Sequence, residues 1–440
     1  NRMEIDKTTL ADLSIINVAD EFSVFNKLNF CRTAGGRHVL FQNFSTPLKT
    51  IEQIQDIQQT LQFIIQNEQY WPPQITNGSV MMIEKFYGAT LDQIPDRPSK
   101  AGVLSYKLFS SADYSFVKFS TEHTFDFIKG MQQLIQYFFT PGTPVPMKKL
   151  LVKVIAALDK KEFEIIEKNI KSKDLSQVSQ LSLAHFFRYR FKNAMQELME
   201  IYFQLDAWYS MAMAVKHFHF TFPSFSNERR PLLDIKGLYH PLLQHPVDYD
   251  LHLLPGKNFL FLTGANMAGK STFIKAVGTA VFMAHIGMGV PAAQMELSVF
   301  DGLLSNINVM DNIIKGESYF YNEVQRIKAT VHKISDRRNW LILIDELFKG
   351  TNVQDAMKCS TAVIVGFVKI PNSTFILSTH LYEISEPLKQ YPNIIFNYFE
   401  TAVENDQLVF NYQLKDGISN DRLGYLILKN EGVVDMLKKL

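Results

Sequence analysis

Residues 264–271, with the sequence GANMAGKS, have the types and the spacing of a loop that binds phosphate. They fit a pattern of glycine, four variable residues, glycine, lysine and a hydroxyl residue. In such a loop the glycines allow backbone amides to surround phosphate oxygens, the lysine reaches the terminal phosphates and the hydroxyl ligates Mg²⁺. An apolar run precedes the loop and a helical pattern follows it, which argues against a chance match. We therefore expect a nucleotide site that contains Lys270 and Ser271.

Two further apolar runs end in polar residues that suit phosphate chemistry. Residues 341–346, LILIDE, end in Asp345 and Glu346. We expect Asp345 to hold Mg²⁺, and Glu346 to accept a proton from the attacking water or to orient it. Residues 375–380, FILSTH, end in His380, which we expect to sense the γ-phosphate or to help position water. Each motif alone also fits a solvated acidic pair or a structural histidine, and their combination with the loop favours the catalytic interpretation.

Residues 311–323, with the sequence DNIIKGESYFYNE, have two interpretations. Gly316 and Ser318 are residue types that form a small anion-binding turn at the start of a helix, and Glu323 would belong to that helix. An ordinary helix start fits the same residues, and the sequence alone favours this second interpretation.

The elements that must position these residues fall into two parts. In the second part of the chain, the short apolar runs NFLFLTG, WLILIDE and TFILSTH alternate with helical stretches. This alternation predicts βα units and a largely parallel sheet. The first part is predicted to be mainly α-helical, with apolar residues at helical spacing between Ile51 and Ile64. We therefore expect a multidomain chain with a mainly α-helical domain at 1–225 and an α/β P-loop NTPase domain at 226–440.

The composition narrows the class of protein. The chain has 440 residues and a formal net charge of +1, so no overall field attracts nucleic acid and any DNA contact must come from local patches. The two cysteines, Cys31 and Cys359, are too few for a disulfide framework, and we expect a cytoplasmic protein. An apolar run long enough to span a membrane does not occur, so we expect no membrane partner.

Taken together, the motifs resemble those of the MutS family. TGANMAGKST, DNIIKGESYFYNE, LILIDELFKGTNVQDA and STHLYEI follow one another in the order and approximate spacing of the MutS ATPase domain, an ABC-like P-loop ATPase. Upstream, residues 28–58 and 204–215 are similar to the start and the closing helix of the MutS lever domain, and 235–243 to the entry to the ATPase domain. The resemblance implies an ATPase that uses ATP and Mg²⁺ to drive a conformational switch of lever domains in DNA mismatch repair.

The resemblance also implies a role for individual residues. Glu346, His380 and Ser318 would be catalytic, with Ser318 reaching the γ-phosphate that the opposite subunit holds. Asp345 and Ser271 would hold the Mg²⁺. Because each ATP site of the family is completed across a dimer interface, we expect a homodimer and slow hydrolysis by a monomer. The residues expected to bind ATP are Gly264, Asn266, Met267, Ala268, Gly269, Lys270, Ser271 and Thr272.

The sequence departs from the family pattern in three ways. Tyr319 stands where the family usually has threonine, and Phe348 and Lys349 replace the usual Gly-Arg after the catalytic acid. The chain also has no Phe-x-Glu tripeptide, the motif with which the family unstacks and reads a mismatched base step. We therefore expect a short form without the N-terminal mismatch-reading and connector domains, which binds duplex or branched DNA with low mismatch selectivity.

The sequence leaves three functions open. The favoured one is an ATP-driven switch that binds DNA through its levers. The second is the same ATPase acting on a protein or RNA partner. The third, a P-loop kinase of small molecules, is disfavoured because a kinase needs no site completed by a partner. Basic clusters at 148–153 and 188–192 fit DNA contacts, but a solvated helix face fits them better.

Overall fold

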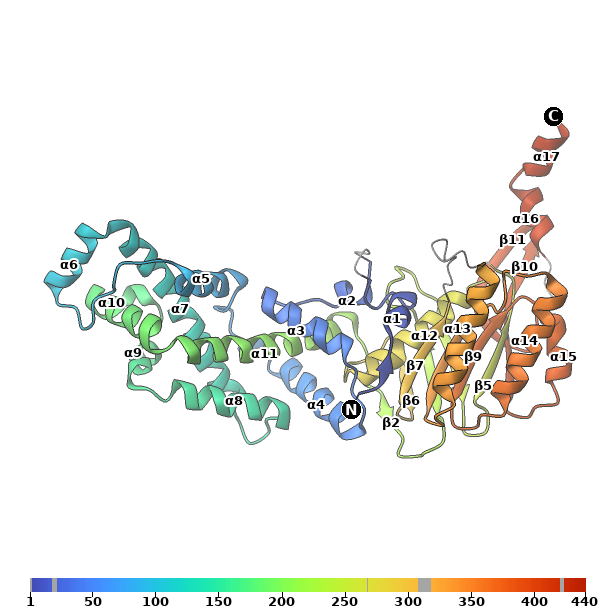
Figure 1. The fold of residues 1–440 in the computed structure, drawn as a ribbon, viewed down its shortest axis with the longest axis horizontal. Coiled ribbons are helices and arrows are strands. Elements are labelled where there is room, and N and C mark those ends of the chain that lie inside the picture. Colours follow the sequence, from blue (N-terminus) through green and yellow to red (C-terminus); the bar gives the residue numbers. More distant parts are fainter. Residues whose placement is uncertain (1, 18–21, 267, 308–317, 420–422) are drawn as a thin grey trace. The chain divides into compact units, whose positions relative to one another are not determined.

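The computed structural model describes residues 2–17, 22–266, 268–307, 318–419 and 423–440, which form two compact units (Figure 1). One unit combines residues 1–27, 46–54 and 218–440 and contains both sheets, and the other combines 28–45 and 55–217 and is helical. The unit with the sheets is therefore discontinuous in sequence. It includes a segment that precedes the predicted domain 226–440, because a short strand near the start of the chain pairs with its main sheet.

The main sheet has seven strands in the order β1-β7-β8-β9-β5-β10-β11. All neighbouring strands are parallel except β10 and β11, which form a hairpin. The predicted largely parallel sheet is confirmed, and β5, β8 and β9 coincide with the three apolar runs. The strands are β1 Glu4–Ile5, β7 Gly302–Asn306, β8 Trp340–Asp345, β9 Thr374–Thr379, β5 Phe259–Thr263, β10 Ile394–Glu404 and β11 Gln407–Asp416.

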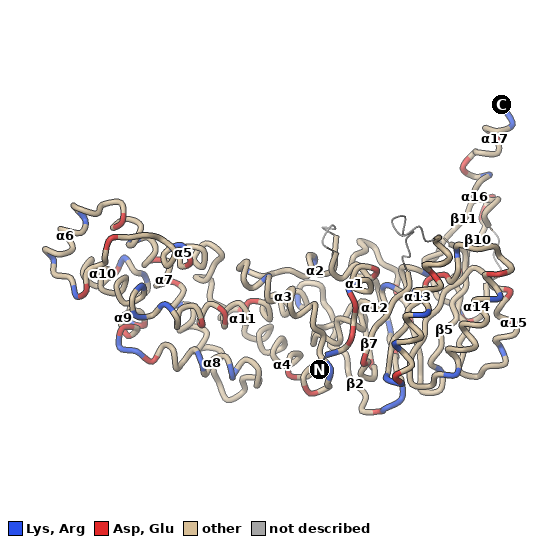
Figure 2. The backbone as a smooth tube through the Cα atoms, viewed as in Figure 1, with Lys and Arg blue, Asp and Glu red and all other residues tan. Residues whose placement is uncertain are grey.

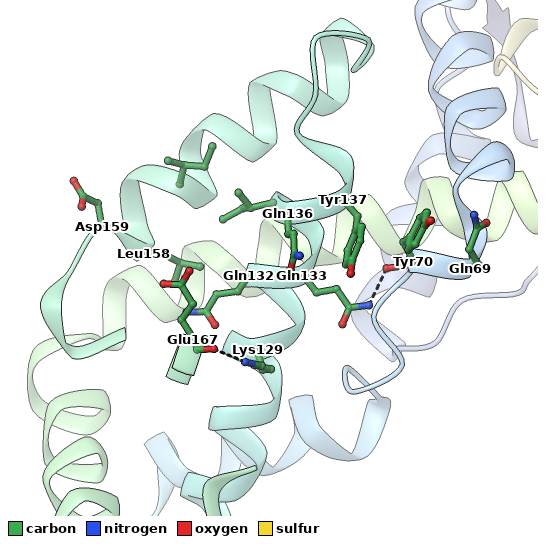
Figure 3. A pocket seen from close by; sticks show the side chains of 12 residues that line it. Gln69, Tyr70, Lys129, Gln132, Gln133, Gln136, Tyr137, Leu158, Asp159 and Glu167 are labelled. Carbon is green, nitrogen blue, oxygen red and sulfur yellow. Dashed lines mark hydrogen bonds between the residues drawn. The ribbon is translucent and has the colours of Figure 1, made fainter. Parts of the chain in front are cut away.

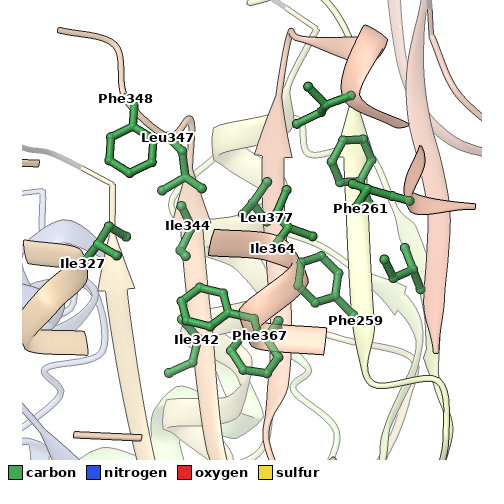
Figure 4. Packing of buried hydrophobic residues seen from close by; sticks show 14 of the residues in the cluster. Phe259, Phe261, Ile327, Ile342, Ile344, Leu347, Phe348, Ile364, Phe367 and Leu377 are labelled. Atoms are coloured by element: carbon green, nitrogen blue, oxygen red, sulfur yellow. The ribbon is translucent and has the colours of Figure 1, made fainter. Parts of the chain in front are cut away.

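Strand β8 is apolar up to its last residue, Asp345, because helices cover both faces of the sheet. On one face Leu343 lies against α12 (Lys270–His285), where a Cβ atom added to Gly278 would be 2.7 Å from the Leu343 side chain. On the other face Ile342 and Ile344 join a buried cluster with residues of α13 (Tyr319–Ile334) and α14 (Val353–Val368) (Figure 4). This packing on both faces fixes the carboxyl end of β8.

A smaller sheet and several short helices complete this unit. The smaller sheet has the order β2-β6-β3-β4. Its strands are β2 Ser224–Phe225, β6 Gln294–Leu297, β3 Leu233–Leu238 and β4 Tyr249–Leu253. The short helices are α1 Lys7–Asp12, α2 Val24–Lys27, α15 Ser385–Leu388, α16 Gly424–Asn430 and α17 Val433–Lys438.

Helix α1 ties the start of the chain to the main sheet. Asp12 is 5% exposed and accepts hydrogen bonds from the Ser305 hydroxyl at 2.6 Å and from the Arg326 guanidinium at 2.5 Å. Thr9 also accepts from the Ser305 backbone amide at 3.2 Å. These polar contacts are buried, so they fix the position of α1 as well as adding to its stability.

The helical unit is built around two long helices, α7 (Ser111–Phe138) and α11 (Lys192–Phe218). The predicted helix that starts at Ile51 is confirmed as α4 (Ile51–Gln66). A π-helical turn, Phe186–Arg190, precedes α11. The other helices are α3 Ala34–Ser45, α5 Asn77–Gly88, α6 Lys100–Phe109, α8 Val145–Leu158, α9 Glu164–Lys168 and α10 Gln177–His185.

A buried carboxylate joins the first segment of the helical unit to α11. Asp206 is fully buried and accepts hydrogen bonds from the backbone amides of Arg32 and Thr33, at 3.0 and 2.9 Å, and from the Thr33 hydroxyl at 2.7 Å. Burial raises the pKa of Asp206, and these hydrogen bonds oppose the shift. A Cβ atom on Gly36 would lie 2.0 Å from the Asp206 carboxylate, so only glycine allows this approach.

Charged residues are mixed along both units, with Lys and Arg interspersed among Asp and Glu (Figure 2). The 45 basic and 44 acidic residues of the sequence nearly cancel. Among the residues that the structure describes, there is no helix with the length and apolar character needed to cross a membrane.

Candidate nucleotide site

The predicted phosphate loop connects β5 to α12. Gly264 and Gly269 have φ angles of +147° and +102°, a region that side chains other than glycine rarely adopt. Gly269 is the N-cap of α12, and Lys270 is the first residue of this helix, so the helix begins directly at the end of the loop. Backbone amides at the start of a helix form a ready site for an anion. Met267, one of the residues predicted to bind ATP, lies outside the described residues.

Lys270 is buried beneath the loop. It is 4% exposed, and its ammonium group donates a hydrogen bond to the Gly264 carbonyl. Burial lowers the pKa of Lys270, and the carboxylates of Glu346 and Asp345 oppose the shift. The lysine is therefore held at the loop, near the two acidic residues at the end of β8.

Asp345, at the end of β8, lies between two hydroxyl groups. Its Oδ2 atom accepts a hydrogen bond from Ser271, the second residue of α12, and its Oδ1 atom accepts one from Ser378 at 2.6 Å. Asp345 and Ser378 are paired across β8 and β9, so the register of the sheet sets this contact. A hydroxyl and a carboxylate oxygen are hard ligands that suit Mg²⁺, which commonly binds through one or two carboxylates and substrate phosphates. The described residues contain no cluster of three or more His, Cys, Asp or Glu suited to a metal.

Glu346 and His380 form an ion pair at the ends of neighbouring strands. The Glu346 Oε1 atom lies 2.8 Å from His380 Nδ1, and the Glu346 side chain is 8% exposed. Thr379 and the backbone amide of His380 donate further hydrogen bonds to the same carboxylate, each at 3.2 Å. The hydrogen bond to Glu346 raises the pKa of His380, partly against its burial. Glu346 has a φ angle of +63°, which is uncommon for a residue with a side chain.

The structure thus brings together most of the residues predicted for the site. Lys270, Ser271, Asp345, Glu346 and His380 converge at the carboxyl ends of β5, β8 and β9, the edge at which open α/β sheets bind ligands. This arrangement suits the binding of a phosphate chain with a divalent cation and the activation of a water molecule.

Comparison with known proteins shows which family the chain resembles. Residues 260–437 match the family model of MutS domain V. DNA mismatch repair protein MutS of Pseudothermotoga lettingae is 34% identical over 232 residues, which are 52% of this chain and 28% of the relative. The MutS of Thermotoga maritima is 29% identical over 302 residues, 68% of this chain and 35% of the relative. DNA mismatch repair protein MSH3 of Candida glabrata is 32% identical over 244 residues, which are 52% of this chain and 23% of the relative. Over these residues the chain is similar to proteins of the MutS family.

The chain spans about a third or less of the length of these relatives. The similarity extends from the unit with the sheets into the helical unit, because the match to the Thermotoga maritima protein covers 68% of the chain and the family model covers 260–437. The predicted MutS resemblance is therefore confirmed.

Ser318 lies at the start of α13 and not at the end of a strand. Its exposed side chain is the N-cap of α13 and accepts a hydrogen bond from the Tyr321 amide at 3.2 Å. Ser318 thus begins a helix, which both interpretations of this segment expected, and its predicted role toward a second subunit stays a prediction. Gly316 lies outside the described residues. Glu323 belongs to α13, as predicted, and is buried.

Phe348 is a bulky residue with a backbone conformation that favours glycine. Its φ angle is +58°, the left-handed region that glycine adopts without strain. The strain costs on the order of 1 to 2 kcal/mol. The Phe348 ring is 5% exposed and joins the buried cluster on the sheet, which offsets this cost because burying such a side chain stabilises by about 2 to 3 kcal/mol.

Tyr412 is a residue of the site that the motifs did not indicate. It lies on β11 with a φ angle of +56°, and its ring lies 3.0 Å from the position of a Cβ atom added to Gly269. Its hairpin has a sequence signal, because Asn405 and Asp406 form a two-residue turn with positive φ angles between paired strands. The sequence can therefore predict the hairpin, but not that its far strand reaches the phosphate loop.

Two cavities differ in their relation to this site. One, of about 350 Å³, adjoins the phosphate loop and is lined by residues that include Asn266, His380 and Phe410. The other, of about 720 Å³, lies in the helical unit and is lined by glutamines and by the stacked rings of Tyr70 and Tyr137 (Figure 3). The larger cavity is lined by none of the residues of the nucleotide site, so cavity size does not indicate where that site lies.

Proposed function

We propose that the chain is a Mg²⁺-dependent ATPase of the MutS type. The observation that carries this proposal is the convergence of Lys270, Asp345, Glu346 and His380 at the carboxyl ends of neighbouring parallel strands. A phosphate loop, a carboxylate for the metal and a carboxylate that accepts a proton would together serve phosphoryl transfer. The similarity to the MutS family agrees with the order of these motifs along the chain.

In this proposal the phosphate loop binds ATP, and two oxygen ligands hold its metal. Backbone amides of Gly264, Asn266, Ala268 and Gly269 would surround the phosphates, with Lys270 and Thr272 beside them. Ser271 and Asp345, already joined by a hydrogen bond, supply a hydroxyl and a carboxylate oxygen. Mg²⁺ bound there neutralises charge on the phosphates.

Glu346 would activate the attacking water, and His380 would control the Glu346 carboxylate through their pairing. The Glu346 carboxylate is nearly buried, which favours its role as a proton acceptor once a water lies within hydrogen-bond reach. His380 is half-exposed and paired with Glu346, so contact with a γ-phosphate would compete for the same imidazole. Tyr412, whose ring lies against Gly269, offers an aromatic face on which a nucleotide base would stack.

A second copy of the chain would complete the site. Ser318 is exposed at the N-terminus of α13, where its hydroxyl and the helix terminus suit an anion presented from outside. We therefore propose a homodimer in which Ser318 of each subunit meets the nucleotide of the other.

Substitutions of Lys270 and Glu346 test the ATPase proposal. Lys270→Ala should abolish ATP binding, because it removes the cation at the phosphates. Glu346→Gln should keep binding and lose turnover by at least about a hundredfold, because an amide cannot accept the proton. The matched control is Glu386→Gln on α15, whose carboxylate is exposed and pairs with Lys389. Equilibrium binding of a fluorescent ATP analogue and phosphate release measure the two steps. Turnover by Glu346→Gln at near the parental rate would contradict the assignment.

The conformational switch is proposed to act on duplex or branched DNA with low mismatch selectivity. The relatives are named as DNA mismatch repair proteins, which favours DNA as the partner. One observation favours a protein partner over either nucleic acid. The charged residues that line the cavity of the helical unit are one lysine, Lys129, and two acids, Asp159 and Glu167 (Figure 3). Their net charge is negative and therefore does not attract phosphate.

A further inference from the structure

The loop that follows β8 is joined to the first turns of α13 by contacts that the proposed reaction does not use. The loop comprises residues 347–350, directly after Glu346, and α13 carries Ser318 as its N-cap. The contacts are a pair of hydrogen bonds to one carboxylate, a ring contact and a close approach of two backbones.

The hydrogen bonds come from Glu323. Its side chain is buried, with the residue 5% exposed, and its two oxygens accept from two successive backbone amides. Oε1 accepts from the Lys349 amide at 2.8 Å, and Oε2 accepts from the Gly350 amide at 2.9 Å. A carboxylate that receives two amides in this way forms charge-assisted hydrogen bonds, which are stronger than those between neutral groups. Glu323 therefore fixes the loop at two consecutive residues.

The other contacts hold the loop at its two ends. The Phe348 ring packs against Phe320, with ring centroids 5.8 Å apart. A Cβ atom on Gly350 would lie 2.7 Å from the Phe320 backbone nitrogen and 2.7 Å from the Tyr319 ring. The backbone of Gly350 is thus in direct contact with the start of α13, and a side chain at this position has no room.

Glu346, the proposed proton acceptor, lies between this attached loop and the sheet. The Glu346 backbone amide donates to the Ser378 carbonyl at 3.0 Å, which fixes one side of the residue to β9. On the other side the chain runs through Leu347 and Phe348 to the amides held by Glu323. Glu346 itself has a φ angle of +63°, so its backbone needs support from both sides to keep a conformation that side chains disfavour.

We propose that Glu323 is a positioning residue for Glu346. By holding the amides of Lys349 and Gly350, it keeps the loop against α13 and so fixes the direction in which the Glu346 carboxylate points. The same contact links the position of Ser318, at the start of α13, to the catalytic acid within one subunit. This inference rests on the proposed ATPase function for its effect on turnover, but the attachment of the loop is testable without it.

Two substitutions of Glu323 separate positioning from nucleotide binding. Glu323→Ala removes both acceptors, and Glu323→Gln keeps one carbonyl oxygen while its NH₂ group faces an amide donor. A hydrogen bond to a charged group is strong enough to change a rate by about tenfold. We expect kcat to fall at least about tenfold in Glu323→Ala and less in Glu323→Gln, with the Kd for ATP within about twofold of the parent. The control is Gln325→Ala, on the exposed face of the same helix.

Amide hydrogen exchange gives a readout that does not depend on activity. In the full chain, the amides of Lys349 and Gly350 should exchange faster in both Glu323 variants than in the parent and in Gln325→Ala. If Glu323→Ala does not fold, the same comparison is made with Glu323→Gln. Unchanged exchange at these two amides would overturn the proposal. So would unchanged kcat in both Glu323 variants while Glu346→Gln abolishes turnover.

The outcomes also separate this inference from the proposed function. If the parent chain does not hydrolyse ATP, the ATPase proposal fails, while faster exchange at Lys349 and Gly350 would still support Glu323 as the residue that holds the loop. If kcat falls only together with ATP affinity and melting temperature, Glu323 has a general structural role and the positioning role is overturned.

Discussion

His380 illustrates at the scale of single residues how the site controls a proton. Its imidazole pairs with a carboxylate that is nearly buried, and this hydrogen bond is the main cause of its raised pKa. The pairing therefore stabilises the protonated imidazole. Its contribution to the stability of the fold is fully present below the ordinary pKa of histidine, about 6.5, and is lost as the pH rises through the raised pKa.

We predict that Glu346→Gln lowers the pKa of His380. The amide keeps the shape of the side chain but removes the charge that favours the imidazolium, so burial of the histidine then dominates. The measurement is an NMR titration of the His380 imidazole in both proteins. Glu386→Gln, which changes an exposed carboxylate, should leave this titration as it is in the parent. An unchanged pKa in Glu346→Gln would show that Glu346 does not set the protonation of His380.

The residues of the site differ in how far the sequence could predict them. Asp345, Glu346 and His380 each lie at the end of an apolar run that the sequence predicts to be a strand, so their meeting at one edge of the sheet follows from parallel pairing. Tyr412 and the two amides held by Glu323 could not be predicted, because their contacts depend on how a distant hairpin and a helix pack. The motif around Ser318 predicted the start of a helix but not which group the Ser318 hydroxyl contacts.

At the scale of elements, the first helix and strand of the chain are held by polar contacts that the sequence pattern does not show. The strands β5, β8 and β9 could be predicted because their apolar runs are uninterrupted and lie next to strong motifs. Strand β1 has two residues and no such pattern. It exists because β7 offers an unpaired edge and because α1 is fixed beside it through Asp12.

We predict that Asp12→Ala lowers the free energy of unfolding by about 2 to 4 kcal/mol, because it leaves the largely buried Arg326 guanidinium without its carboxylate. The matched control is Lys333→Ala, which removes a more exposed ion pair with Asp6 at 3.6 Å and should cost less than about 0.5 kcal/mol. Urea unfolding of the three proteins measures the difference. Equal losses in the two variants would show that the buried pair carries no special weight.

At the scale of the whole molecule, the near-cancellation of charge limits how DNA could be bound. With a net charge of +1, attraction must come from local groups such as the exposed lysines Lys148, Lys149 and Lys153. Contacts of this kind reach phosphates and carry no information about base pairing.

We predict DNA binding that weakens steeply as salt is raised from about 50 to about 200 mM. The affinities for paired and mismatched duplexes should agree within about tenfold, or ~1.4 kcal/mol. Fluorescence anisotropy with linear, branched and mismatched DNA, with and without ATP, measures this. The Lys270→Ala variant is the control, since ATP should leave its DNA binding unchanged. Absence of binding to every DNA at low salt would favour the protein or RNA partner. A stronger preference for a mismatch would show that the protein recognises mismatched bases.

The order in which the chain is synthesised gives the discontinuous unit a further consequence. Thr9 contacts Ser305, which is 296 positions later, and β1 pairs with β7 across a similar span. Residues 1–27 therefore leave the ribosome long before β7, the strand that pairs with β1, and the helical unit can be completed in between. Met3 and Leu10, buried in the finished fold, stay accessible to water and to chaperones during that interval. Pairing of β1 at this edge of the sheet thus waits until residues 302–306 have been synthesised.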